Sequence, residues 1–290
     1  MQIAQVRRFN RVATERAGAL SDRFLGRKRP VGQARLLWEI GREGADVRDL
    51  RARLGLDSGY LSRLLRALEA DGLVSVRPDA ADGRVRRATL TPRGEREWDE
   101  LESRSETLAA SVLEPLSERH GRELVSAMET VERLLTASMI AVGVESPRSP
   151  AGRWCLEQYF AELNERFDAG FDPARSSLAD PDEMEPPTGL FLVARLRGAP
   201  VGCGGLILPA GAPAEIKRMW VAPAVRGLGL GRRLLAELER CARESGATAA
   251  RLDTNRNLAE AISMYRSSGY AEIPRFNDER YAHHWFEKPL

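Results

Sequence analysis

Apolar residues recur every three or four positions through most of the first half of the chain, which is the spacing of one helix face. The clearest stripe predicts a helix over residues 58–70 and consists of Leu61, Leu64, Leu65 and Leu68. A shorter helix is predicted over residues 46–54, with Asp46 as its cap and a tight turn after it. Gly72 is the expected end of the longer helix.

A hairpin and long helices are predicted after this helix pair. Residues 73–77 and 85–91 are strand-like runs, and the turn-forming residues 79–83 separate them. Helical spacing then continues over residues 92–142. The first half is therefore expected to be mainly α-helical with one small hairpin.

The second half changes to short apolar runs, which predict strands, separated by helical segments. This order is typical of an α/β domain with a mixed sheet. The expected strands are residues 190–196, 201–208, 215–221, 249–253 and 281–287, and the expected helices are residues 153–167, 232–244 and 258–267.

Length and composition favour two globular domains. The 290 residues exceed one typical domain, and residues 143–152 concentrate Gly, Ser and Pro, as linkers do. We expect a first domain over residues 1–142, a linker over 143–152 and a second domain over 153–290.

No apolar run is long enough to span a membrane, and the N-terminus lacks a signal-peptide core. We therefore expect a cytoplasmic protein without membrane contact. The three cysteines lie far apart and are expected to be reduced, and with three histidines no metal site is expected. The net charge of +2 selects no class of partner.

The most informative motif is the glycine-rich stretch at residues 226–231, which follows a predicted strand and opens a predicted helix. The first turn of a helix leaves backbone N–H groups unpaired, and the helix dipole favours an anion there. The spacing differs from the dinucleotide and P-loop fingerprints. The motif predicts a phosphate site, and an ordinary surface turn remains the alternative.

Two short helices joined by a tight turn and followed by a hairpin are typical of a winged helix-turn-helix. With the leucine stripe inward, small and basic residues face outward on the second helix and on the hairpin tip. An ordinary solvated face remains the alternative for each arginine. The expected DNA-contacting residues are Ser58, Gly59, Ser62, Arg63, Arg66, Arg84, Arg86 and Arg87.

Residues 5–142 resemble the MarR family of bacterial regulators. The resemblance rests on residues 50–63, on residues 68–74 and on the wing at residues 82–94. It implies binding to double-stranded DNA as a homodimer held together by terminal helices. Packing within one subunit remains the alternative for the apolar residues concerned, which are Val6, Phe9, Val12, Leu20, Leu124, Met128, Val131, Leu134 and Leu135.

Residues 153–290 resemble the GNAT acetyltransferase superfamily. The resemblance rests on the strand at residues 215–221, on the Arg-x-x-Gly-x-Gly loop, and on Asn257, Tyr265 and Gly269. It implies acetyl-coenzyme A as co-substrate and no metal. The family's strand before its first helix is not visible, so that strand is either absent or hidden in the linker.

The resemblance also implies roles for individual residues. Backbone groups of residues 219–221 pair with the pantetheine arm, Asn257 bonds the same arm or caps a helix, and Tyr265 protonates the departing thiolate or is a core aromatic. The coenzyme-binding residues are then Met219, Trp220, Val221, Arg226, Gly227, Leu228, Gly229, Leu230, Gly231, Arg232 and Asn257.

An amine acceptor must lose a proton before it attacks a thioester. Glu215 is our candidate base, because an even number of residues separates it from Met219 and strand alternation places both on one face. His283 and His284 are the alternatives. The leading hypothesis is a DNA-binding regulator fused to an N-acetyltransferase that acts by direct attack of an amine, with a small metabolite, an amino acid or a protein lysine as the acceptor. The alternatives are a regulator that only senses acetyl-coenzyme A, and an enzyme whose first domain serves only for dimerisation.

Overall fold

The computed structural model describes residues 2–17, 25, 29–79, 82–168, 170–173 and 181–290. The chain forms two compact units, Met1–Glu129 and Thr130–Leu290, which are described separately. No helix among the described residues combines the length and apolar character needed to cross a bilayer.

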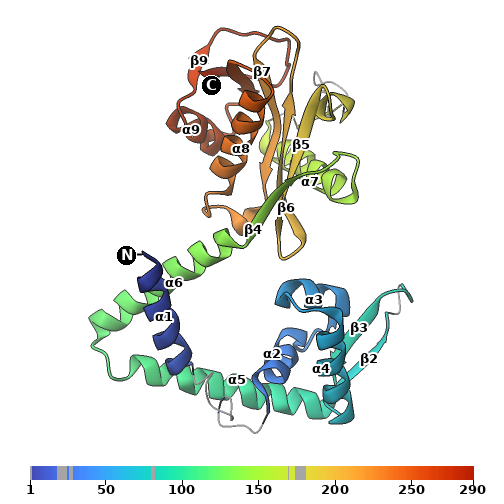
Figure 1. Ribbon diagram of the computed structural model, residues 1–290, viewed down its shortest axis with the longest axis vertical. Helices are drawn as coiled ribbons and strands as arrows, with labels where there is room; N and C mark the ends of the chain where they lie inside the picture. Colours follow the sequence, from blue (N-terminus) through green and yellow to red (C-terminus); the bar gives the residue numbers. More distant parts are fainter. Residues whose placement is uncertain (1, 18–24, 26–28, 80–81, 169, 174–180) are drawn as a thin grey trace. The chain divides into compact units, whose positions relative to one another are not determined.

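The first unit is mainly α-helical and contains a small antiparallel sheet with the strand order β1-β3-β2 (Figure 1). Its elements are α1 (Gln2–Arg16), α2 (Val31–Ile40), β1 (Ala45–Asp46), α3 (Val47–Leu54), α4 (Ser58–Ala70), β2 (Val74–Pro78), β3 (Arg86–Leu90), α5 (Pro92–Leu113) and the start of α6 (Glu118–Ser138).

Local capping explains why α3 and α4 begin and end where they do. Asp46 accepts a hydrogen bond from the Arg48 N–H at 2.5 Å, and Asp57 accepts one from the Tyr60 N–H at 2.8 Å. Between the helices, Gly55 takes a left-handed conformation with φ 62°. The four leucines of the predicted stripe are buried. The winged helix-turn-helix prediction is confirmed.

The second unit contains a mixed sheet with the strand order β4-β5-β6-β7-β8-β10-β9. All neighbours pair antiparallel except β7 and β8, which are parallel. Its elements are β4 (Ile140–Val144), α7 (Pro150–Arg166), β5 (Gly189–Leu196), β6 (Ala199–Ile207), β7 (Ala214–Val221), α8 (Leu230–Glu244), β8 (Ala249–Thr254), α9 (Ala259–Ser267), β9 (Ala271–Ile273) and β10 (His284–Pro289), with 3-10 turns η3 (Pro181–Met184) and η4 (Pro223–Val225).

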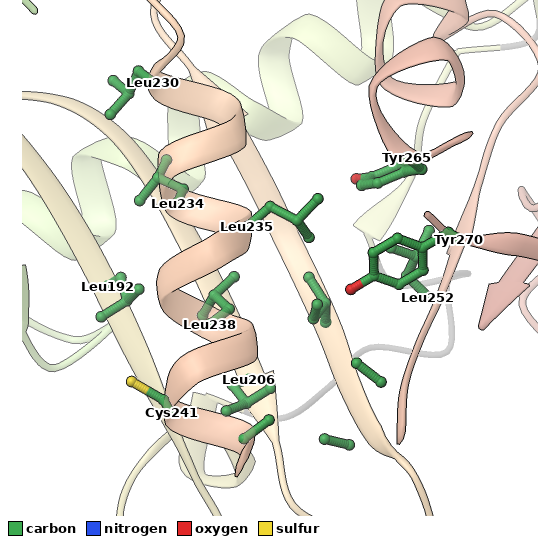
Figure 2. Packing of buried hydrophobic residues seen from close by; sticks show 14 of the residues in the cluster. Leu192, Leu206, Leu230, Leu234, Leu235, Leu238, Cys241, Leu252, Tyr265 and Tyr270 are labelled. Atoms are coloured by element: carbon green, nitrogen blue, oxygen red, sulfur yellow. The ribbon is translucent and has the colours of Figure 1, made fainter. Parts of the chain in front are cut away.

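Helices cover both faces of this sheet. A Cβ atom at Gly202 on β6 would lie 3.4 Å from Leu230 and 3.5 Å from Leu234 of α8, whereas the next residue, Cys203, packs with Cys155 of α7. Successive strand residues point to opposite faces, so α7 and α8 lie on opposite faces, as Figure 1 also shows. Figure 2 shows the α8 leucines packed against the strands in the larger core.

The division between the units differs from the expected one. The boundary falls at Glu129–Thr130, within α6, whereas residues 143–144 of the expected linker belong to β4 and residues 150–152 to α7. The helix expected up to residue 142 ends at Ser138. Ile140 is buried and pairs with Leu196, so β4 is the strand missing from the sequence pattern.

Candidate functional site

The glycine-rich loop leaves β7 through η4 and enters α8 with its backbone in an unusual conformation. Gly227 and Gly229 have φ values of 77° and 79°, and Gly229 is the N-cap of α8 without any side-chain cap. The first helical hydrogen bond runs from the Arg233 N–H to the Gly229 carbonyl at 3.1 Å. The N–H groups of residues 230–232 therefore have no intrahelical acceptor.

Arg226 corrects one detail of the expected phosphate site. Its backbone N–H donates to the Pro223 carbonyl at 3.2 Å, so this group is not free to bind a ligand. Its Nε donates to the Val221 carbonyl at 3.0 Å, and its guanidinium forms an ion pair with Glu162. Arg226 therefore fixes the loop to β7 and α7, and the available donors begin after it.

The loop opens onto a groove of about 530 Å³. The opposite wall is the end of β7, whose pairing with β8 is confined to Ala214 and Glu215. Because β7 and β8 diverge beyond that point, residues 219–221 have no β8 neighbour on that edge. The residues that line the groove include Glu162, Arg166, Met219, Trp220, Val221, Arg226, Gly227, Gly229, Leu230, Gly231, Arg232, Glu260 and Tyr265.

A smaller cavity of about 100 Å³ adjoins the groove. Six residues line both spaces, so the two meet there: Tyr159, Leu163, Met219, Leu258, Ala261 and Tyr265. The other residues that line the smaller cavity are partly aromatic and partly charged. The aromatic residues are Phe167, Phe171 and Tyr281, the basic residues are Lys217 and Arg218, and the acidic residues are Asp253 and Glu279.

Tyr265 stands at this junction and also belongs to the core. Its ring is 6.0 Å from Tyr270 and 6.1 Å from Phe286, and Figure 2 shows it beside Tyr270. Burial raises the pKa of Tyr265 well above its ordinary value, and electrostatic interaction with Tyr159 and Asp253 adds to the increase. The phenol is therefore protonated at neutral pH, as a proton donor must be.

The placement of Glu215 contradicts the expected alternation. A bulge interrupts the pairing of β6 with β7 between Cys203 and Gly205, and Arg218 adopts a φ of 56°. Ile216 and Met219, three residues apart, consequently face the same core. Glu215 therefore does not share a face with Met219.

The carboxylate of Glu215 is also occupied by structural partners. It binds Arg251 at 2.6 Å and Lys217 at 3.3 Å, and it lines neither the groove nor the smaller cavity. His283 and His284 line neither space, and His284 contacts Glu272 at 2.6 Å.

Two residues that sequence reasoning missed, Asp253 and Glu279, are the carboxylates of the smaller cavity. Asp253 binds Lys217 at 2.5 Å, and Glu279 accepts the Tyr281 N–H at 3.1 Å. Glu279 lies in the irregular segment before β10, and no local pattern marks such a position.

The side chain of Asn257 is bound by residues at the end of α7. Its side-chain amide donates to the Arg166 carbonyl at 2.8 Å and to Asp168 at 3.2 Å, and it does not line the groove. The N-cap of α9 is Leu258, which has no side-chain cap bond, so the capping interpretation is wrong. Asn257 instead ties the end of α7 to the start of α9.

The expected DNA-contacting residues are all exposed on α4 and on the wing, and none of them belongs to the core. The Arg63 guanidinium lies over the Tyr60 ring at 5.7 Å, Arg66 donates to the Ser62 carbonyl at 3.3 Å, and Arg87 donates to the Glu43 carbonyl at 2.7 Å. Arg84 lies in the turn before β3, so it does not alternate with Arg86 along a strand.

Apolar residues on α1 and α6 are largely without packing partners. Neither helix contains a buried residue, and Val6, Val12 and Leu134 are each more than half exposed. Leu20 lies outside the described residues. The described residues also contain no cluster suited to hold a metal ion.

Two family models match the chain in separate regions. Residues 156–270 match the acetyltransferase (GNAT) family, and residues 25–85 match the MarR family. These ranges fall on the sheet that contains the groove and on the winged helix, respectively.

Individual known proteins are similar to parts of the chain. An IAA acetyltransferase of Azospirillum brasilense is 38% identical over 135 residues, which cover 46% of this chain and 85% of that protein. An uncharacterized N-acetyltransferase of Schizosaccharomyces pombe is 34% identical and covers 40% of this chain and 71% of its own length. A solved MarR-family transcriptional regulator from Rhodococcus sp. RHA1 is 22% identical with a TM-score of 0.35 and covers 42% of this chain and 88% of its own.

Proposed function

Because the second half of this chain belongs to the GNAT acetyltransferase family and its first half carries a MarR-family winged helix, we propose that the protein binds DNA and transfers the acetyl group of acetyl-coenzyme A to an amine. The observation that carries the enzymatic proposal is the set of unpaired N–H groups at residues 230–232, which open onto a groove that ends at Tyr265. Such donors at a helix N-terminus fit a diphosphate.

The proposed positions of the substrates follow from the two adjoining spaces. The diphosphate lies against the glycine loop, and the pantetheine arm follows the unpaired edge of residues 219–221, as an added strand would. The thioester then lies at the junction beside Tyr265 and Met219, and the acceptor amine occupies the smaller cavity.

The proposed reaction is a direct attack of the neutral amine on the thioester carbonyl. A new C–N bond forms, the C–S bond breaks, and Tyr265 donates its phenolic proton to the departing thiolate. In place of Glu215, Glu279 is our candidate for accepting the proton of the amine, because it lines the cavity. Glu279→Gln is then expected to lower kcat at neutral pH, and an unchanged kcat contradicts this role.

The proposed DNA-binding form is a homodimer. The exposed apolar faces of α1 and α6 support this, because a second copy of the chain would remove them from water. The basic residues of α4 and the wing would then meet DNA twice in each dimer.

A thiol-release assay tests the enzymatic proposal. The full-length protein is incubated with acetyl-coenzyme A and a panel of amines, and free thiol is measured over time. Amine-dependent release is expected. Tight binding of acetyl-coenzyme A without release for any amine would instead favour a regulator that senses the coenzyme.

A further inference from the structure

Arg218 is a cation of the smaller cavity that lacks a carboxylate partner among the described residues. Its neighbour Lys217 binds Asp253 at 2.5 Å and Glu215 at 3.3 Å. The Arg218 guanidinium instead lies over two rings of α7, 5.0 Å from the centroid of Phe160 and 6.0 Å from that of Tyr159. Stacking on aromatic faces holds a guanidinium in place while its N–H groups stay available for a ligand.

The backbone at Arg218 is unusual for a residue with a side chain. Its φ of 56° lies in the left-handed region, at the bulge that interrupts the pairing of β6 with β7. This conformation is costly for any residue other than glycine, and such positions cluster where a side chain must be aimed at a ligand. The bulge turns Arg218 toward the cavity that it lines.

The size and lining of the cavity restrict what can enter. Its volume of about 100 Å³ corresponds to several water molecules, since one water needs about 10–15 Å³ by the same measure. A small molecule fits this space, and Phe167, Phe171 and Tyr281 offer an apolar wall to it.

We infer that the acceptor is a small amino acid with an apolar side chain, and that Arg218 binds its carboxylate. This inference rests on the proposed acetyl transfer. The carboxylate accepts two parallel N–H bonds from the guanidinium, the apolar group packs on the aromatic wall, and the amine faces Tyr265 and the thioester. The side chain of a protein lysine has no carboxylate at the matching distance from its amine.

A comparison of matched acceptors with the full-length protein tests the inference. Thiol release is measured with four acceptors: leucine, leucinamide, isoamylamine and a lysine-containing peptide. The comparison is repeated with phenylalanine, its amide and its decarboxylated amine. The kcat/KM of leucine or phenylalanine is expected to exceed that of its amide by at least about tenfold, which is the effect of one charge-assisted hydrogen-bonded pair.

The outcomes separate the two proposals. Turnover at equal rates for acid and amide, or faster turnover of the peptide, overturns the inference and leaves acetyl transfer standing. No thiol release with any amine overturns the acetyl transfer and the inference with it.

Variants locate the recognition at Arg218. Arg218→Gln is expected to raise the KM of leucine about 10–100-fold and to change the KM of isoamylamine much less, and Arg218→Lys is expected to recover part of the loss. Arg197→Gln is the matched control, because Arg197 is exposed in the β5–β6 turn and also has a positive φ, 52°. An equal effect at both positions overturns the assignment.

A measurement on the unaltered protein covers the case in which Arg218→Gln does not fold. Isovalerate, which has the carboxylate and lacks the amine, is expected to inhibit competitively against the acceptor, whereas isovaleramide is not. Equal inhibition by the two compounds contradicts a carboxylate site.

Discussion

Tyr265 of α9 and Met219 of β7 both line the junction at which the large groove meets the smaller cavity. They come from elements that are far apart in sequence, and the divergence of β7 from β8 opens the space between them. The phenol of Tyr265 stays protonated because of its burial. Met219 lies on the part of β7 that has no β8 partner. A proton donor therefore adjoins the place where an extended thioester arm would end.

Replacement of Tyr265 by Phe tests the role of this phenol. Tyr265→Phe is expected to lower kcat about 10²–10⁴-fold, because a positioned general acid contributes on that scale. Affinity for acetyl-coenzyme A should change little, since the ring and its packing remain. Steady-state thiol release and calorimetric titration measure the two quantities.

Tyr270→Phe is the matched control for this experiment. Tyr270 is buried next to Tyr265, with ring centroids 6.0 Å apart, but it lines neither space. Loss of the hydroxyl there should leave kcat unchanged. Similar kcat values for Tyr265→Phe and the unaltered protein would show that Tyr265 has a structural role only.

The winged helix predicts salt-dependent DNA binding. Arg63→Ala on α4 and Arg86→Ala on the wing are each expected to weaken binding and to lower the slope of log K against log salt by about 1 if the arginine contacts a phosphate. Arg122→Ala is the control, because Arg122 is exposed on α6 and pairs with Glu118 of the same helix. Fluorescence anisotropy with labelled duplex at several salt concentrations gives these slopes. Binding that all three variants retain equally would place the DNA-contacting surface elsewhere.

Two tyrosines that folding shields from water predict a loss of stability at alkaline pH. Burial raises the pKa of Tyr159 to about 12, and the pKa of Tyr265 rises in the same direction. A pKa above the unfolded value of about 10 means that the folded state binds the proton more tightly. The stability from Tyr159, about 3 kcal/mol, is therefore complete below about pH 10 and is lost between about pH 10 and 12.

Urea denaturation from pH 8 to pH 11 measures this loss. The free energy of unfolding should fall above pH 10, and it should fall less steeply in Tyr159→Phe than in the unaltered protein. Tyr60→Phe, at an exposed position, is the control and should follow the unaltered protein. Parallel curves for all three would contradict the effect of burial.

Local signals in the sequence were sufficient for much of the fold. The bounds of α4, Ser58 to Ala70, follow from its leucine stripe and from the N-cap Asp57. Both the buried face and the cap are encoded within one segment. The same holds for the glycine loop, whose conformation depends on Gly227 and Gly229 themselves. Such features need no knowledge of distant contacts.

Features that depend on distant contacts could not be predicted in this way. Ile140 belongs to a strand only because it pairs with Leu196, and its own segment continues the spacing of α6. Strand alternation predicts the wrong face for Glu215 because the bulge at Arg218 interrupts the alternation of β7. Glu279 reaches the cavity from an irregular segment, where no periodic pattern constrains its direction.

The account depends most on diphosphate binding by the glycine loop, and a pair of glycine variants isolates that interaction. Gly229 and Gly246 have φ values of 79° and 87°, and a Cβ atom at either would meet nothing within 4 Å. Alanine is therefore expected to cost about 1–2 kcal/mol of stability at both positions, through backbone strain alone. Gly229 lies within the loop, so relief of its strain is expected to shift the loop N–H groups, whereas Gly246 lies beyond the far end of α8.

Calorimetric titration with acetyl-coenzyme A and with acetyl-pantetheine, which lacks the diphosphate and the nucleoside attached to it, tests the central claim most directly. The account predicts that the unaltered protein and Gly246→Ala bind acetyl-coenzyme A at least about 100-fold more tightly than acetyl-pantetheine, since several charge-assisted bonds are involved. It also predicts that Gly229→Ala loses most of this difference. Equal affinity of the unaltered protein for both compounds would contradict the account.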